Sequence, residues 1–84
     1  MRVSGDVVWS PLEGELVLYH ASEERYFGLN EVGARIWRML AEAAPVDEIV
    51  ERLQAEYEVD PTTARSEVFR LLNELMEARL VVQE

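Results

Sequence analysis

Few side chains of this sequence could carry out catalysis, and they are scattered along the chain. A single histidine, His20, stands in a strand-like run with no obvious nucleophile beside it. The serines, Ser4, Ser10, Ser22 and Ser66, show neither a nucleophile-elbow pattern nor a pairing with lysine. Because the chain also lacks cysteine, thiol catalysis and zinc–cysteine sites are excluded. We therefore expect a protein that is not an enzyme.

Acidic residues are numerous, but their spacing matches no common ligand pattern. The close acidic pairs at positions 23–24, 56–58 and 74–77 are spaced as solvated faces, not as calcium loops or HExxH zinc sites. The four glycines form no phosphate-binding loop. The sequence therefore predicts neither a metal nor a cofactor.

Charge and composition restrict the partners further. The net charge is −9 and all eight basic residues are arginines. This balance weighs against a nucleic-acid-binding protein, because such proteins neutralise phosphates with clustered basic side chains. No signal peptide and no apolar run of about 18 residues occur, so we expect no membrane span and a cytoplasmic protein. With 84 residues, 49% of them hydrophobic, we expect one domain over residues 1–84.

The elements that must position any binding residues follow a simple order. Strand-like runs cover residues 3–9, 15–20 and 25–29, and the first two are separated by the turn-like SPLEG at 10–14. Alternation within the second run places Leu16, Leu18 and His20 on one face and Val17 and Tyr19 on the other. We therefore predict a three-stranded antiparallel sheet.

Three helices follow the sheet. Asn30 is a good N-cap for a first helix, which Pro45 ends, and residues 46–57 have the spacing of a second. Asp60 and Pro61 open a third helix that runs to about residue 79, and the tail 80–84 could add a short strand. The order predicts an α+β fold of the winged helix-turn-helix type.

The third predicted helix has an unusually wide apolar arc. At 100° per residue the arc spans about 160°, whereas a helix needs roughly 100° to rest on a core. Its residues are Ala64, Val68, Phe69, Leu71, Leu72, Leu75 and Met76. Either the same chain covers the extra width, or Phe69, Leu72 and Met76 line a groove beside the edge strand 25–29, which could accept an extended peptide.

Three stretches resemble one protein family. The family signature consists of an aromatic strand, then Leu-Asn, then a helix with a small residue and Ile-Trp, and residues 26–37 resemble it with YFGLNEVGARIW. The second helix of the family is matched by VDEIVERL at 46–53, and the third by YEVDPTTARSEVFRLLNEL at 57–75. These are features of PqqD-like proteins, the peptide-recognition elements of pathways for ribosomally synthesised, post-translationally modified peptides. The resemblance covers about residues 14–82.

The resemblance implies that the chain binds the leader segment of a precursor peptide as an added antiparallel strand on the third strand, beside the third helix. The implied contacts are Glu24, Arg25, Tyr26, Phe27, Gly28 and Leu29 of the strand and Arg65, Val68, Phe69, Leu72 and Met76 of the helix. Because side chains alternate along a strand, one set of strand residues supports the core, and we expect Phe27 and Leu29 to point inward.

The family resemblance also implies a pathway. Stand-alone chains of this size resemble the leader-binding proteins of lasso-peptide biosynthesis, which act beside a separate transglutaminase-like cysteine protease and a cyclase. The alternative is a PqqD-type chaperone of another modified-peptide pathway or of pyrroloquinoline quinone synthesis. The Asp-Gly that PqqD itself usually has between the first two helices is replaced here by EAAPVDE.

Two other functions use the same fold or surface. A winged-helix DNA-binding regulator would insert the third helix into the major groove, but that helix carries Glu67, Glu74 and Glu77, and its arginines form no continuous stripe. A homodimer could form by pairing of two edge strands, and the sequence leaves this possibility open.

Overall fold

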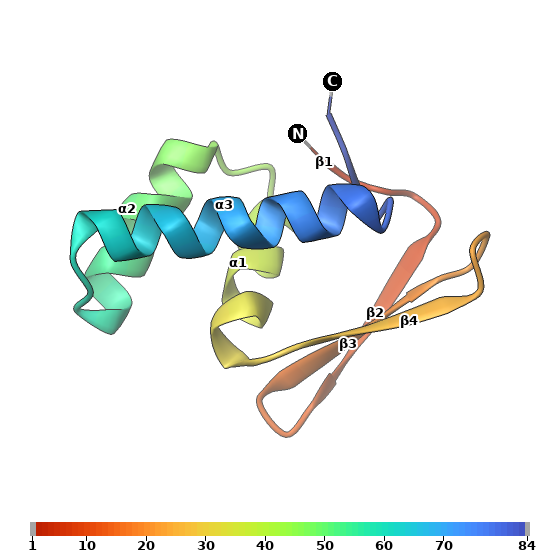
Figure 1. Ribbon diagram of the computed structural model, residues 1–84. Helices are drawn as coiled ribbons and strands as arrows, with labels where there is room; N and C mark the ends of the chain where they lie inside the picture. The colour runs from red at the N-terminus through yellow and green to blue at the C-terminus, as the bar shows by residue number, and fades with distance from the viewer. Residues whose placement is uncertain (1, 84) are drawn as a thin grey trace.

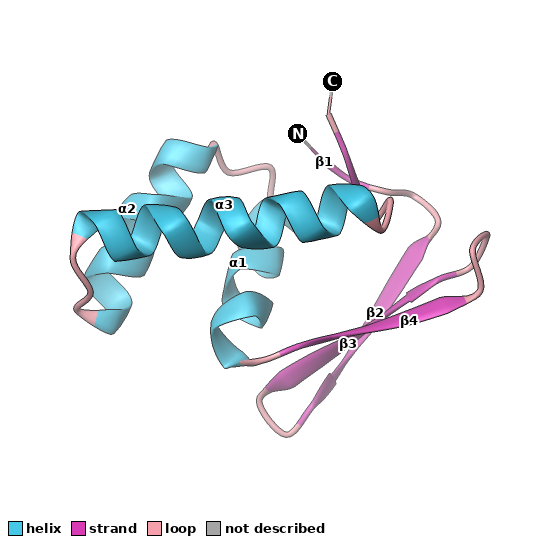
Figure 2. Ribbon diagram, viewed as in Figure 1, coloured by secondary structure: helices cyan, strands magenta, loops and turns pink. Residues whose placement is uncertain are grey.

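The computed structural model describes residues 2–83 (Figure 1). The elements are β1 (Arg2–Val3), β2 (Val7–Leu12), β3 (Glu15–His20), β4 (Arg25–Leu29), α1 (Glu31–Ala41), α2 (Val46–Tyr57), α3 (Pro61–Glu77) and β5 (Val81–Val82). Figure 2 shows the three longer strands at one end of the molecule and the helices at the other. The predicted α+β order of a sheet followed by three helices is confirmed.

The main sheet is an antiparallel meander in the order β2-β3-β4. Leu16, Leu18 and His20 of β3 are buried, while Val17 and Tyr19 between them are half-buried, so the predicted alternation of faces is confirmed. Within residues 2–83, β4 has no strand on its other side.

The first predicted strand is divided in two. The sequence predicts one strand over residues 3–9, but the chain turns after Val3, where the backbone oxygen of Ser4 accepts from the Val7 amide at 3.3 Å. This turn lets β1 leave the main sheet and pair with β5, which lies on the predicted C-terminal strand. Two elements far apart in sequence are thereby joined.

The turn between β2 and β3 is shorter than the sequence predicts. Ser10, Pro11 and Leu12 belong to β2, and only Glu13 and Gly14, both with positive φ, make the turn. Pro11 fits within β2 because β2 is an edge strand, where a missing backbone donor breaks no ladder.

Both capped helix starts form as predicted. The side chain of Asn30 accepts from the Gly33 amide at 2.9 Å at the start of α1. At the start of α3 the Asp60 carboxylate accepts from the Thr63 amide at 2.8 Å, and Pro61 occupies the first turn. Each cap satisfies a backbone donor that the helix itself cannot.

The helix ends depend on residues in left-handed conformation. α3 ends at Glu77, before the predicted end near residue 79, because Arg79 has a φ of 61° and Leu80 donates to the Leu75 oxygen at 2.9 Å. This is the Schellman arrangement of backbone bonds. It turns the chain back toward β1 and so positions β5.

The core lies between the inner face of the sheet and the three helices. Trp37 of α1 is fully buried, and its ring stands edge-on to Trp9 of β2, with ring centroids 5.5 Å apart. On the surface, Arg35 of α1 donates two hydrogen bonds to the Glu56 carboxylate of α2 and fixes one helix against the other. These contacts hold α1, and with it the end of β4, in place.

Candidate functional site

The candidate site begins at the free edge of β4. An edge strand presents backbone amides and carbonyls that can pair with an extended peptide. β4 ends at Leu29 and the next residue, Asn30, caps α1, so no loop separates strand from helix. The α1 end of the edge is therefore held by the core.

A cavity of about 220 Å³ lies beside this edge. Its lining comes from β4, the start of α1 and α3: Phe27, Gly28, Leu29, Asn30, Val32, Gly33, Ile36, Glu67, Arg70, Leu71 and Glu74. The free strand edge thus faces a helix across a hollow, which leaves room for a strand added to β4.

Two further cavities extend the first in both directions. One, of about 330 Å³, shares Asn30, Val32 and Glu67 with it and continues between α2 and α3, where its lining is largely apolar. The other, of about 320 Å³, shares Phe27 and Glu74 and lies toward the β3–β4 turn. We call the three together the β4–α3 cleft.

The strand residues predicted to contact a peptide lie at this edge. Glu24 is exposed in the turn before β4, and Tyr26, on the outer face of the sheet, is 75% exposed. Phe27 is half-buried against the core and Leu29 is buried, as the predicted inward orientation requires. The cleft is lined by Arg25, Phe27, Gly28 and Leu29. Their contact with a peptide stays a prediction.

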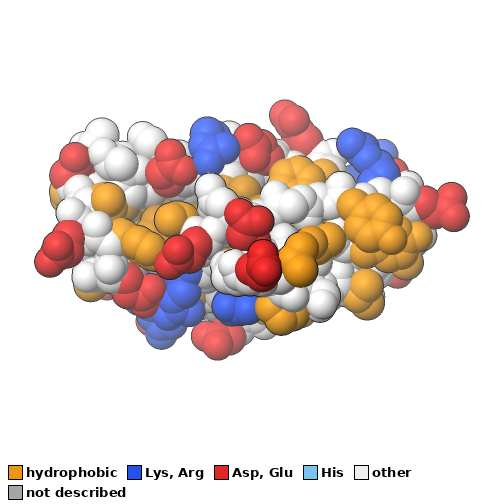
Figure 3. Space-filling model, turned by 90° about the horizontal axis from the view of Figure 1, so that it is seen from below, with side chains coloured by type: hydrophobic (Ala, Val, Ile, Leu, Met, Phe, Trp, Pro, Cys, Tyr) orange, Lys and Arg blue, Asp and Glu red, His pale blue; other side chains and the backbone are white. Residues whose placement is uncertain are grey.

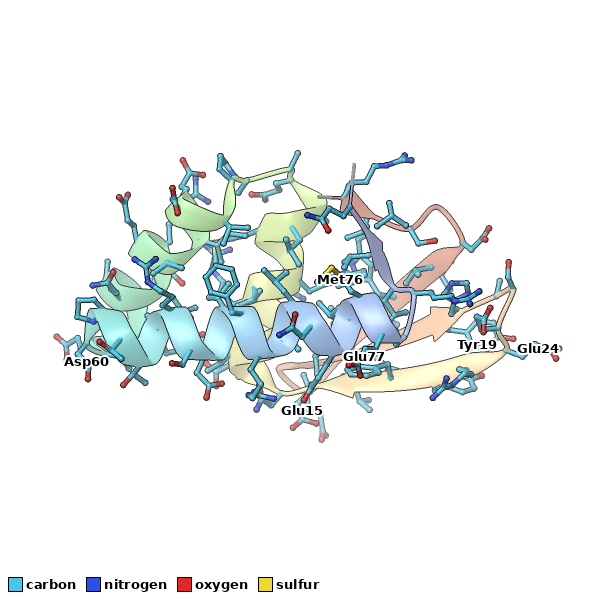
Figure 4. All side chains as sticks on the ribbon, turned by 45° about the horizontal axis from the view of Figure 1, so that its top comes forward. Glu15, Tyr19, Glu24, Asp60, Met76 and Glu77 are labelled. Carbon is cyan, nitrogen blue, oxygen red and sulfur yellow. The ribbon has the colours of Figure 1, made fainter. Side chains whose placement is uncertain are left out.

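None of the five predicted helix residues lines the β4–α3 cleft in the described chain. Val68 and Leu72 are buried in the core, with exposed fractions of 0% and 2%. Arg65 and Phe69 lie on the exposed surface. Met76 lines a different cavity, next to β5, and Figure 4 shows it on the opposite side of α3 from Glu77.

The surface that α3 turns toward β4 is instead mostly charged. It consists of Glu67, Arg70, Leu71, Glu74 and Glu77. Helical periodicity identified the apolar arc correctly, but it could not show which flank of that arc meets the strand. The only sequence signal is the 67-70-74-77 spacing of charges beside Leu71, which a solvated helix face shares.

Comparison with known proteins identifies the family. The family model described as "Coenzyme PQQ synthesis protein D (PqqD)" matches residues 15–81. The chain belongs to the PqqD family. The resemblance read from the sequence is thereby confirmed. A search of curated proteins finds no match to this PqqD-family chain.

Two solved structures resemble this PqqD-family protein over its whole length. The structure of TbiB1 in complex with the TbiA(beta) leader peptide has a TM-score of 0.94 and 37% sequence identity, and the match covers 100% of this chain and 98% of that one. A lasso peptide synthetase B1 complexed with the leader peptide has a TM-score of 0.89 and 23% identity over 98% and 96% of the two chains. At that identity the second likeness shows the fold alone.

Some of the charged side chains that line the β4–α3 cleft form ion pairs with one another within α3. Arg70 donates to Glu67 at 3.0 Å and to Glu74 at 2.9 Å, and its hydrogen bond to Glu67 is the main cause that raises the pKa of Arg70. This arginine is therefore engaged by two carboxylates, and α3 presents a surface dominated by acids. Such a surface is poorly suited to DNA phosphates.

His20, the single histidine, has a structural role in a turn. His20 is 5% exposed, and its Nδ1 accepts from the Glu23 amide at 3.2 Å, so it supports the β3–β4 turn. Among residues 2–83 no three His, Cys, Asp or Glu side chains are arranged to hold a metal ion. No helix in the same range is long and apolar enough to cross a membrane.

Proposed function

We propose that this chain is a non-catalytic adaptor that binds the leader segment of a ribosomally made precursor peptide in the β4–α3 cleft. The leader adds to β4 as an antiparallel strand, and the adaptor presents the attached peptide to the processing enzymes of lasso-peptide biosynthesis, a leader peptidase and a cyclase. The observation that carries the proposal is the free edge of β4 beside a cleft of three connected cavities. The likeness to leader-bound TbiB1 supports it.

The geometry gives the bound leader a direction. An antiparallel partner runs opposite to β4, so the residues before the paired segment reach the apolar cavity around Val32 and Tyr57. The peptide that follows the leader leaves past Arg25 and the β3–β4 turn. The part to be modified is thereby released at the edge of the molecule, where an enzyme can reach it.

Main-chain pairing and side-chain pockets have different roles in such a complex. Backbone hydrogen bonds provide affinity that depends little on sequence, and pockets for alternate side chains provide selectivity. The 37% identity to TbiB1, which was solved with a leader peptide, supports leader binding. The assignment to the lasso class and not to pyrroloquinoline quinone synthesis is supported by the missing Asp-Gly between α1 and α2.

Titration of a fluorescently labelled TbiA(beta) leader peptide into purified protein tests the proposal. Val32→Arg places a long, charged side chain between two of the cavities and should weaken binding at least about tenfold, because its bulk fills the space that the leader would occupy and replaces an apolar contact surface. Phe69→Arg, on the exposed surface of α3 away from the cleft, is the matched control and should bind within about twofold of wild type.

Absence of binding to the wild type, or equal weakening by both variants when both remain folded by circular dichroism, would refute the cleft assignment. A second series replaces single leader amides by N-methyl amides. Affinity should fall at every second position of the paired segment, because alternate amides of an added strand face β4. A series without this alternation would exclude strand addition.

A further inference from the structure

Gly28, in the middle of β4, has no evident reason within the described chain to be glycine. Its φ is not in the left-handed region; among the glycines of residues 2–83, only Gly14 has a positive φ. A Cβ added to Gly28 would meet nothing within 4 Å. Glycine weakens a strand, and inside strands it often marks a place where another chain approaches closely.

The bare backbone of Gly28 lies on the outer face of the sheet. Gly28 pairs with Val17 of the neighbouring strand β3. The next residue of β4 on the same face is Tyr26, which is 75% exposed. The Tyr26 ring rests against Tyr19, with ring centroids 4.7 Å apart. Figure 3 shows hydrophobic side chains gathered at the right, where the sheet lies. The two nearest side chains on this face, Val17 and Tyr26, are largely apolar, and Tyr26 is exposed.

The position of Gly28 on the edge strand determines what can reach it. A strand added to β4 places every second side chain on the outer face, within about 4.5–5.5 Å of its cross-strand neighbour. Large side chains commonly cover a glycine on the strand beside them. A leader strand in the cleft therefore has one side chain directly beside the bare backbone.

We propose that a bound leader lays one large apolar side chain, aromatic or branched, over Gly28 on the outer face of the sheet, against Tyr26 and Val17. This inference rests on the proposed function and adds a second specificity position to it. It lies on the face opposite to the cleft, so the leader is recognised from both faces of the sheet. Acidic side chains are disfavoured here, because Tyr26, Gly28 and Val17 offer no positive charge and Glu15 lies on the same face of β3.

A display library of the TbiA(beta) leader peptide, with each position randomised in turn, tests this inference by comparing selection on wild type and on Gly28→Thr. One leader position should enrich large apolar residues on wild type and Gly or Ala on Gly28→Thr. Binding of the large-residue peptides to the variant should fall about tenfold or more, because the added side chain occupies the same space. Ser10→Val adds bulk on the same face but at β2, and should leave the profile unchanged.

Identical profiles on wild type and Gly28→Thr would overturn the inference while leaving leader binding intact. Failure of every library member to bind wild type would instead refute the proposed function. Thermal melting checks that Gly28→Thr is folded. If it is not, Tyr26→Ser replaces it: the same leader position should then lose its preference for large apolar residues, and an unchanged preference would again overturn the inference.

Discussion

The joint between β4 and α1 gives a prediction with a calculable size. Asn30 has extended backbone geometry, with φ −73° and ψ −177°, and its side-chain oxygen accepts from the Gly33 amide at 2.9 Å. Its own carbonyl accepts the first bond of α1, from Ala34 at 2.7 Å. Asn30→Ala removes the side-chain bond and leaves the backbone bond. The Gly33 donor then has no partner from the cap residue.

The expected loss is about 1 kcal/mol of unfolding free energy, within a range of about 0.5–2 kcal/mol for such caps. For a domain of this size 1 kcal/mol corresponds to a fall in melting temperature of about 4–8 °C. Asn30→Ser is the matched control, because serine caps nearly as well and is also short. Urea unfolding followed by circular dichroism measures all three proteins.

Stability of Asn30→Ala equal to that of Asn30→Ser and of wild type would refute the cap as a stabilising contact. Weakened leader binding by Asn30→Ala at a temperature where it is fully folded would add information, because the first turn of α1 lines the cleft. The cap would then also fix the geometry of the site.

Two further predictions concern α3. Leu72→Ala should lower the free energy of unfolding by about 2–5 kcal/mol, because the Leu72 side chain is 2% exposed. Phe69→Ala should lower it by less than about 1 kcal/mol, because Phe69 is 45% exposed. Equal effects of the two substitutions in urea unfolding would contradict the placement of α3. The hydrogen bond from the Thr63 amide lowers the pKa of Asp60, so the stabilisation is present above the ordinary pKa of aspartate and lost as pH falls through the lowered value. Asp60→Asn keeps a capping side chain that does not titrate, so the melting temperature of this variant should fall less steeply than that of wild type as the pH is lowered. An equally steep fall would show that other acidic residues cause the loss of stability at low pH.

Local chemistry was sufficient for much of the fold. The two cap residues, Asn30 and Asp60, place the starts of α1 and α3, because capping depends on a few adjacent residues. The alternation in β3 and the apolar run of each helix depend only on side-chain period. The family resemblance, carried by the stretch from Tyr26 to Trp37, added the peptide-binding edge.

Long-range contacts decided what the sequence left open. The division of the first predicted strand follows from pairing of β1 with β5, at the other end of the chain. Pro11 joins β2 because that strand lies at an edge, which is a property of the assembled sheet.

The site shows the same limit most clearly. The apolar arc of α3 was read correctly from sequence, yet Val68 and Leu72 are core residues and the cleft is lined by Glu67, Arg70 and Glu74. Periodicity gives the angles of side chains relative to one another, but the rotation of a helix against a sheet is set by the packing of all its neighbours. The sequence by itself determined that a strand edge and a helix exist, and only the tertiary structure decided which side of the helix faces that edge.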